Sequence, residues 1–236
     1  MKTLFCILFC FFSFLMSEAV CAKSFESTYE AQGMNMVLLS ADISIETNQT
    51  GYMINTHSYA RGILSLFIDS ETIFQTRGKF EQNRLKIIDS VMKNKKRKYI
   101  RTTQQNFNEK QGFIDYQSIL IELMRLSDVQ SHTFYVSDGK RDMRITLTYE
   151  GKRDLSEINS GLTGQADAYS VQIDVIAGKK KGWFFERMRE SQKSPLRLYM
   201  QADEQIGEKT LIAATFDTGV IGKLYIVRKE LKNVQN

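Results

Sequence analysis

Apolar and polar residues alternate with a period of two along much of the chain. The clearest runs lie at 41–46, 145–150, 171–175 and 196–203. Such runs put one row of side chains into a core and the other into water, as strands of antiparallel sheets do. The stretch at 223–227 is apolar after its first lysine, which predicts a strand in the interior of a sheet.

Turn signals separate these runs. They stand at 48–51, 137–140, 178–182, 206–207 and 218–219. The sharpest is Asp138-Gly139, because both residues tolerate positive φ between two strand-like segments. Runs and turns together predict about ten to twelve strands.

One segment follows a helical period instead. Between 116 and 126 the apolar residues fall on one helical face, namely Tyr116, Ile119, Leu120, Leu123 and Met124. We expect Asp115 to cap this helix, and Ile114 to pack against Ile119 as a hydrophobic staple. A weaker pattern at 62–67 allows a second short helix.

The expected fold is mainly β: a large curved antiparallel sheet or open barrel with one packed α-helix.

The first 22 residues have the pattern of a cleavable signal peptide. Lys2 is followed by a mostly apolar stretch at 4–16 and by small residues ending at Ala22. About thirteen apolar residues are too few to span a bilayer as a helix, so an uncleaved anchor is the weaker alternative. The residues before Cys10 and Cys21 do not fit a lipidation site. We therefore expect export to the periplasm, with an extracellular destination as the alternative.

Removing residues 1–22 would also remove every cysteine, since all three lie there. The exported chain would then have no disulfide, thiol nucleophile or cysteine metal ligand. Residues 23–236 are enough to bury about 70% of the unfolded surface in one domain. No linker rich in Pro, Ser or Gly interrupts them, so we expect a single β-rich domain.

The chain is moderately basic, with a formal charge of +5. Part of the excess stands in two clusters, at 93–98 and 179–181. Such clusters can bind anionic lipid or nucleic acid, but we expect solvated turns that blunt sheet edges, and no nucleic acid partner. The role of both clusters stays open at this stage.

No pattern of catalytic residues is present. His57 and His132 stand alone, and no Gly-x-Ser-x-Gly elbow occurs. The Ser-x-x-Lys matches at 90–93 and 137–140 are chance matches, and 161–164 lacks the rest of a dinucleotide or phosphate loop. We expect no enzyme, and we assign no catalytic, cofactor-binding or metal residue and no cofactor.

Binding stays open. A curved sheet with one helix can enclose an apolar cavity for a small ligand. The 15 Phe and 10 Met of the chain, several of them in the first 22 residues, could line such a cavity or fill a core. Sequence alone does not separate these alternatives, so no ligand-binding residue is assigned.

The order of these features over about residues 25–230 resembles a bacterial family known as domain-of-unknown-function family 3108. The segments that carry the resemblance are 115–120, 134–141, 149–151, Trp183, 194–198 and 222–224. Where that family starts its helix with Asp-Pro-Leu, this chain has Asp115-Tyr116-Gln117. The resemblance implies a β-rich envelope protein of Gram-negative bacteria, related to the open barrels of periplasmic lipoprotein carriers. It implies no functional residues.

Two functions fit this description. The first is a soluble periplasmic protein that binds a lipid or other hydrophobic ligand, with 115–127 as a lid, or that binds an envelope protein. The second is a structural or assembly factor of the envelope that uses a strand edge or the basic turns. An exported effector with 93–98 as a nuclear address is a more remote alternative. The oligomeric state is left open.

Overall fold

The computed structural model describes the chain from Lys23 to Val234 with several gaps. The described residues are 23–62, 65, 70–82, 84–96, 99–105, 107, 112–125, 130–178, 196–204, 206–217 and 222–234. The expected signal peptide at 1–22 and the basic cluster at 179–181 lie outside them. The short helix expected at 62–67 is described only at residues 62 and 65.

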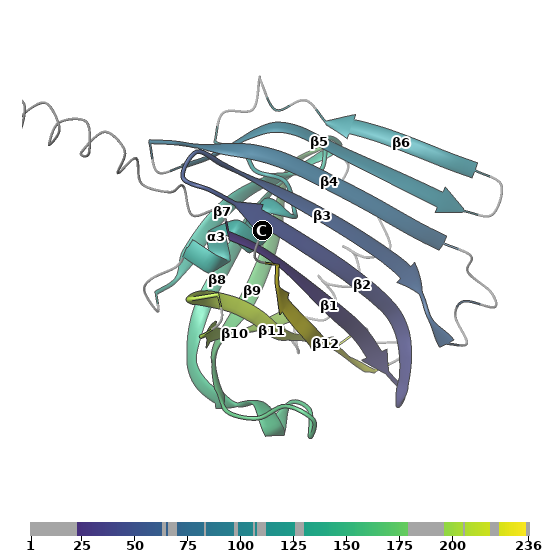
Figure 1. Cartoon of the computed structure of the whole chain (residues 1–236), viewed down its shortest axis with the longest axis vertical. Coiled ribbons are helices and arrows are strands. Elements are labelled where there is room, and N and C mark those ends of the chain that lie inside the picture. Colours follow the sequence, from purple (N-terminus) through teal and green to yellow (C-terminus); the bar gives the residue numbers. More distant parts are fainter. Residues whose placement is uncertain are drawn as a thin grey trace, which may run out of the picture.

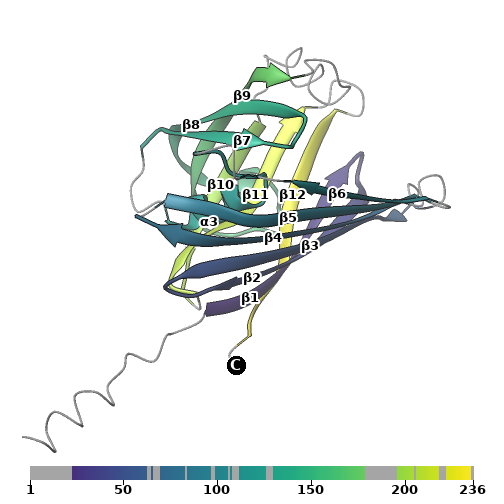
Figure 2. The ribbon, with the colours of Figure 1, turned by 90° about the horizontal axis from the view of Figure 1, so that it is seen from above.

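Twelve antiparallel strands form one sheet (Figures 1 and 2). The strands are β1 (Lys23–Gly33), β2 (Met36–Thr47), β3 (Gly51–Ala60), β4 (Ser70–Glu81), β5 (Arg84–Lys96), β6 (Tyr99–Gln105), β7 (His132–Ser137), β8 (Arg141–Asp154), β9 (Gln165–Gly178), β10 (Leu196–Asp203), β11 (Glu208–Asp217) and β12 (Lys223–Asn233). Their order is β6-β5-β4-β3-β2-β1-β12-β11-β10-β9-β8-β7. The sheet is thus two meanders, β1–β6 and β7–β12, which are joined where β1 pairs with β12.

β-Bulges help to roll this sheet around its one α-helix. Register shifts interrupt the β1–β12, β1–β2, β4–β5, β8–β9 and β10–β11 pairs. A bulge bends its strand and increases the local twist. The two meanders therefore face each other, with α3 (Ser118–Arg125) between them (Figure 2). The edge strands β6 and β7 do not pair with each other along their described lengths, so the barrel is open.

The space between the meanders is a hydrophobic core. Its largest cluster takes fully or nearly fully buried side chains from both meanders and from the helix, including Ile54, Ile121, Leu123, Val136, Met143 and Leu147. Burying an aliphatic side chain contributes about 1.5–3 kcal/mol. The expected fold class, a mainly β protein with an open curved sheet and one packed helix, is confirmed.

Most sequence predictions of strands and turns are also confirmed. All four alternating runs lie within strands, and the 223–227 stretch begins β12, which has a strand on each side. In the β7–β8 turn, Gly139 has φ +77° and the Asp138 carboxylate accepts from the Lys140 and Arg141 amides. The turns expected at 218–219 and after Gly178 fall outside the described residues.

Two predictions need correction. The helix is shorter than the predicted 116–126, because Asp115 caps the Ser118 amide and leaves residues 116 and 117 in a turn. The basic run at 93–98 is not simply a turn, since its first four residues belong to β5 and pair with β4 as far as Lys96. None of the helices in the described chain is both long and apolar enough to cross a membrane.

One glycine makes room for an aromatic ring that reaches the helix. Gly78 lies at the β4 bulge, and a Cβ atom there would overlap the Tyr52 ring. We expect Gly78→Ala to destabilise the fold by about 1–3 kcal/mol in urea unfolding, because the ring must move. The loss should largely vanish in a Tyr52→Ala background. Additive losses in this double-mutant cycle would contradict the steric explanation.

Candidate functional site

Two consecutive residues connect the facing meanders. Ile114 forms a parallel bridge with Val136 of β7. Its amide donates to the Tyr135 carbonyl at 2.9 Å, and its carbonyl accepts from the Ser137 amide at 2.9 Å. The next residue, Asp115, turns to the other meander. We call Ile114 and Asp115 the clasp.

The Asp115 carboxylate is completely buried, at 0% exposure, and accepts three hydrogen bonds. One oxygen accepts from the hydroxyls of Thr76 on β4 and Ser90 on β5, the latter at 2.8 Å. The other accepts from the Ser118 amide at 2.8 Å and so caps α3, as the sequence predicted. A buried carboxylate is tolerated only when its oxygens are satisfied, and these donors satisfy both.

Further polar contacts hold the start of α3 against β3. The Tyr52 hydroxyl lies 2.8 Å from Ser118 Oγ, and the Thr56 hydroxyl donates to Gln117 Oε1 at 3.4 Å. Burial raises the pKa of Tyr52, so the phenol stays neutral. Within the described residues, the buried Nε2 of Gln117 has no hydrogen-bond partner, nor does the buried Oε1 of Gln105.

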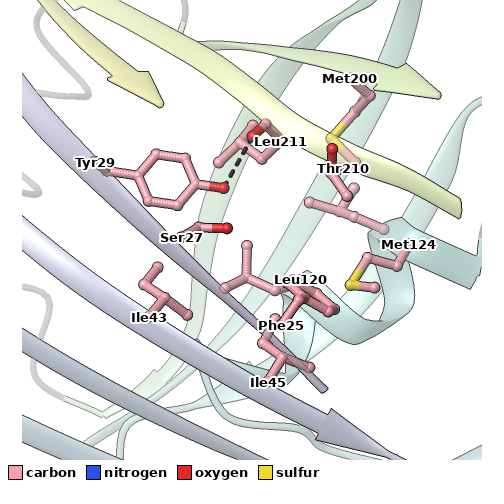
Figure 3. A pocket seen from close by; sticks show the side chains of 11 residues that line it. Phe25, Ser27, Tyr29, Ile43, Ile45, Leu120, Met124, Met200, Thr210 and Leu211 are labelled. Atoms are coloured by element: carbon pink, nitrogen blue, oxygen red, sulfur yellow. Dashed lines mark hydrogen bonds between the residues drawn. The ribbon is translucent and has the colours of Figure 1, made fainter. Parts of the chain in front are cut away.

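A small cavity lies between α3 and the strands β1, β2, β10 and β11 (Figure 3). Its volume is about 20 Å³, room for about one water molecule. The lining side chains are mostly apolar: Phe25, Ser27, Tyr29, Ile43, Ile45, Leu120, Leu123, Met124, Met200, Thr210 and Leu211. Among the described residues, the side of the sheet that faces α3 is therefore largely a filled core, with this narrow space beside the helix.

One part of the cavity wall is polar. The Tyr29 hydroxyl donates to the Leu211 carbonyl at 2.9 Å, and Ser27 and Thr210 lie close by (Figure 3). Burial raises the pKa of Tyr29 to about 12, although Arg228 opposes this rise. Arg228 donates to Thr210 Oγ1 at 2.7 Å and to Asp203 at 3.1 Å. The cavity thus combines an aliphatic wall with hydroxyl groups backed by a paired guanidinium.

The two histidines considered from the sequence do not come together. His57 on β3 pairs with Glu71 at 2.7 Å, which lowers the pKa of that carboxyl together with Lys95. His132 on β7 stacks on Phe134, with ring centroids 6.4 Å apart. The described part of the chain contains no group of three or more His, Cys, Asp or Glu side chains placed to hold a metal ion.

Sequence reasoning found only part of this site. It predicted the Asp115 cap. It also predicted a staple between Ile114 and Ile119; Ile114 lies in the core cluster and Ile119 packs against that cluster. It missed Thr76 and Ser90 as partners of Asp115. Ser90 had been considered only within a Ser-x-x-Lys match. No local signal could reveal these contacts, because 39 and 25 residues separate the partners.

Comparisons with known proteins add little to this description. No family model matches the chain, so the resemblance to family 3108 gains no specific support, and no curated protein matches either. A β-barrel-like DUF1849 protein from Brucella abortus aligns over 92% of this chain and 100% of its own, with 11% identity and a TM-score of 0.44. A DUF1329 family protein from Desulfovibrio piger aligns over 92% and 87%, with 12% identity and a TM-score of 0.32. Both are of families without known function, and similarity at this level carries no argument.

The clasp should dominate the stability of the site. Asp115→Ala removes a helix cap and leaves two buried hydroxyls without their acceptor, so we expect a loss of about 3–5 kcal/mol in urea unfolding. Asp154→Ala is the matched control, since Asp154 also caps a short helical turn, at Ser156, but is exposed. It should cost much less. Equal losses would show that Asp115 acts only as a cap.

The acidic residue within α3, Glu122, should make stability depend on pH. Burial raises the pKa of Glu122, although Arg125 and His132 oppose this. A carboxyl whose pKa is raised by folding favours the folded state at low pH, and this advantage is lost as pH rises from the unfolded pKa of about 4.3 through the folded value. Glu122→Gln should therefore stabilise the protein at pH 7 and have no effect near pH 3, measured by urea unfolding. A gain of the same size at both pH values would contradict this assignment.

Proposed function

We propose that this protein binds a hydrophobic ligand with a small polar head, in the space between α3 and the sheet. The observation that carries the proposal is the cavity with its aliphatic wall and its hydroxyl-lined end. Small-molecule sites are commonly apolar clefts with a few placed polar groups, and this cavity has that composition. Binding without turnover is part of the proposal.

The size of the cavity sets a condition on binding. About 20 Å³ holds no acyl chain, so α3 must move to admit one. The clasp holds the start of the helix, whereas its last residue, Arg125, places its guanidinium 4.9 Å from the centre of the Phe80 ring. Since one guanidinium nitrogen of Arg125 is buried, this cation–π contact is worth about 2 kcal/mol, less than we expect from the clasp. We propose that α3 swings outward from this end while the clasp stays closed.

The lining residues suit such a change. Leu120, Leu123 and Met124 lie on α3, and Met200 lies on β10 opposite them. Methionine side chains are flexible and adapt to ligands of varied shape. Ser27, Tyr29 and Thr210 would receive the polar head, since all three carry hydroxyls beside the apolar wall.

We further propose that binding takes place in the periplasm. The support for this is the charged, apolar and small-residue pattern of residues 1–22. The donor or acceptor of the ligand would be an envelope protein, the partner that the sequence led us to expect.

Native mass spectrometry of protein from an osmotic-shock fraction tests the proposal. We expect a chain that lacks residues 1–22, with part of it carrying an acyl-chain mass. Purified protein should then bind palmitate saturably. Leu120→Trp, which fills the cavity, should weaken palmitate binding by about tenfold, or 1.4 kcal/mol.

Leu39→Trp is the matched control, because Leu39 is exposed on β2 and does not line the cavity. It should leave palmitate affinity unchanged. The proposal fails if folded wild-type protein binds no palmitate, or if both tryptophan variants weaken binding equally.

A further inference from the structure

The two edges of the open sheet differ in how far other parts of the chain cover them. The edge of β7 is partly covered by the chain itself, since Ile114 pairs with it through two backbone hydrogen bonds. The edge of β6 pairs with β5 on one side and has no strand on the other among the described residues. In Figure 1, β6 forms the outer border of the sheet.

The sequence of β6 protects this edge by charge alone. Its residues, Tyr-Ile-Arg-Thr-Thr-Gln-Gln, favour strands and include no proline, glycine or acidic residue. Tyr99 is 78% exposed and Ile100 73% exposed. Natural edge strands are usually blunted by bulges, prolines or charged side chains, because unpaired backbone groups attract other strands. Within β6 the one charged side chain is Arg101, so this edge of seven residues is fit for the addition of a strand of opposite charge.

Charge restricts the partner. Residues 90–108 include six basic residues and no acidic one, the basic residues being Lys93, Lys95, Lys96, Arg97, Lys98 and Arg101. Lys93 and Lys95 on β5 stand opposite Thr102 and Ile100 of β6, and all four positions share one face of the sheet. Arg101 is exposed on the other face. Lys95 already pairs with Glu71 at 3.3 Å, so Lys93 on one face and Arg101 on the other carry the positive charge of the β6 edge.

We propose that β6 is the docking edge for an extended acidic segment of another polypeptide, which adds to the sheet as a further strand. Backbone hydrogen bonds to β6 provide the pairing, and acidic side chains of the partner meet Lys93 on one face and Arg101 on the other. This goes beyond the proposed ligand binding and does not depend on it, since β6 contributes nothing to the cavity.

Two other occupants fit less well. A second copy of this chain would bring two basic edges together, and like charges opposite each other in a sheet are destabilising. An anionic membrane would use the charge but not the unpaired backbone. Tyr99 and Ile100 also point to opposite faces of the strand, because side chains alternate.

The test uses the whole protein and a defined probe. The probe is a fluorescein-labelled, end-capped octapeptide that alternates Val or Thr with Glu or Asp. We expect saturable binding, measured by fluorescence anisotropy, that weakens in about 0.3 M salt. Bound peptide should slow hydrogen exchange of the outward-facing amides in β6 by at least about tenfold.

Matched controls separate strand addition from simple charge attraction. A fully N-methylated peptide has the same charges but no backbone donors, and it should bind at least about tenfold more weakly. Arg101→Glu should weaken binding by about fivefold. Lys152→Glu makes the same charge change at an exposed position near the end of β8, and it should have little effect.

Several outcomes would overturn the proposal. The wild-type protein could bind no peptide, or it could bind the N-methylated peptide as tightly as the unmodified one. Bound peptide could also leave hydrogen exchange in β6 unchanged, or Arg101→Glu and Lys152→Glu could weaken binding equally. The same holds if Ile100→Lys abolishes a dimer of the free protein, which would assign the edge to a second copy. Binding to phosphatidylglycerol vesicles that is sensitive to Arg101→Glu, with no peptide binding, would assign it to a membrane.

Discussion

The three hydrogen bonds to the buried Asp115 carboxylate determine how the two halves of this protein fit together. The backbone of Ile114 pairs with the edge of β7, and the side chain of Asp115 accepts hydrogen bonds from β4 and β5. The same carboxylate fixes where α3 begins. The position of the helix, the distance between the meanders and the shape of the cavity therefore depend largely on these three hydrogen bonds inside an apolar core. Because a buried polar group without hydrogen-bond partners is costly, these contacts allow little variation.

The rest of the fold follows from that constraint together with the curvature of the sheet. Bulges at five strand pairs bend the sheet far enough for its meanders to face each other. The helix α3 then fills the interior of the curved sheet. In a small closed barrel, side chains alone fill this space. The cavity beside α3 is narrow, with its polar end near Arg228. Binding at this place must compete with a packed core, so the energy needed to move α3 limits the affinity for any ligand.

Sequence patterns predicted the fold class and most elements, but they predicted little of the site. Strict alternation marked β2, β8, β9 and β10, and the Asp115 cap followed from a local rule. The β6 strand gave no such signal, because an edge strand with few buried residues need not alternate. The partners of Asp115 were beyond prediction for another reason: hydroxyl residues such as Thr76 and Ser90 are common on strands, and only the pairing of distant segments shows which of them are buried.

The pairing of β1 with β12 has a consequence for how the molecule is made. These strands bring residues 23–33 beside residues 223–233, the two ends of the described chain. During synthesis the N-terminal residues are made first, so the meander β1–β6 can form early. The free edge of β1 stays unpaired until β12 has been made. Contacts so distant in sequence form slowly, since a long loop must close before they contribute. Until then the growing chain exposes an unpaired strand of eleven residues that lies at the centre of the finished sheet. The risk of wrong strand pairing or aggregation therefore lasts until residues 223–233 have paired with β1.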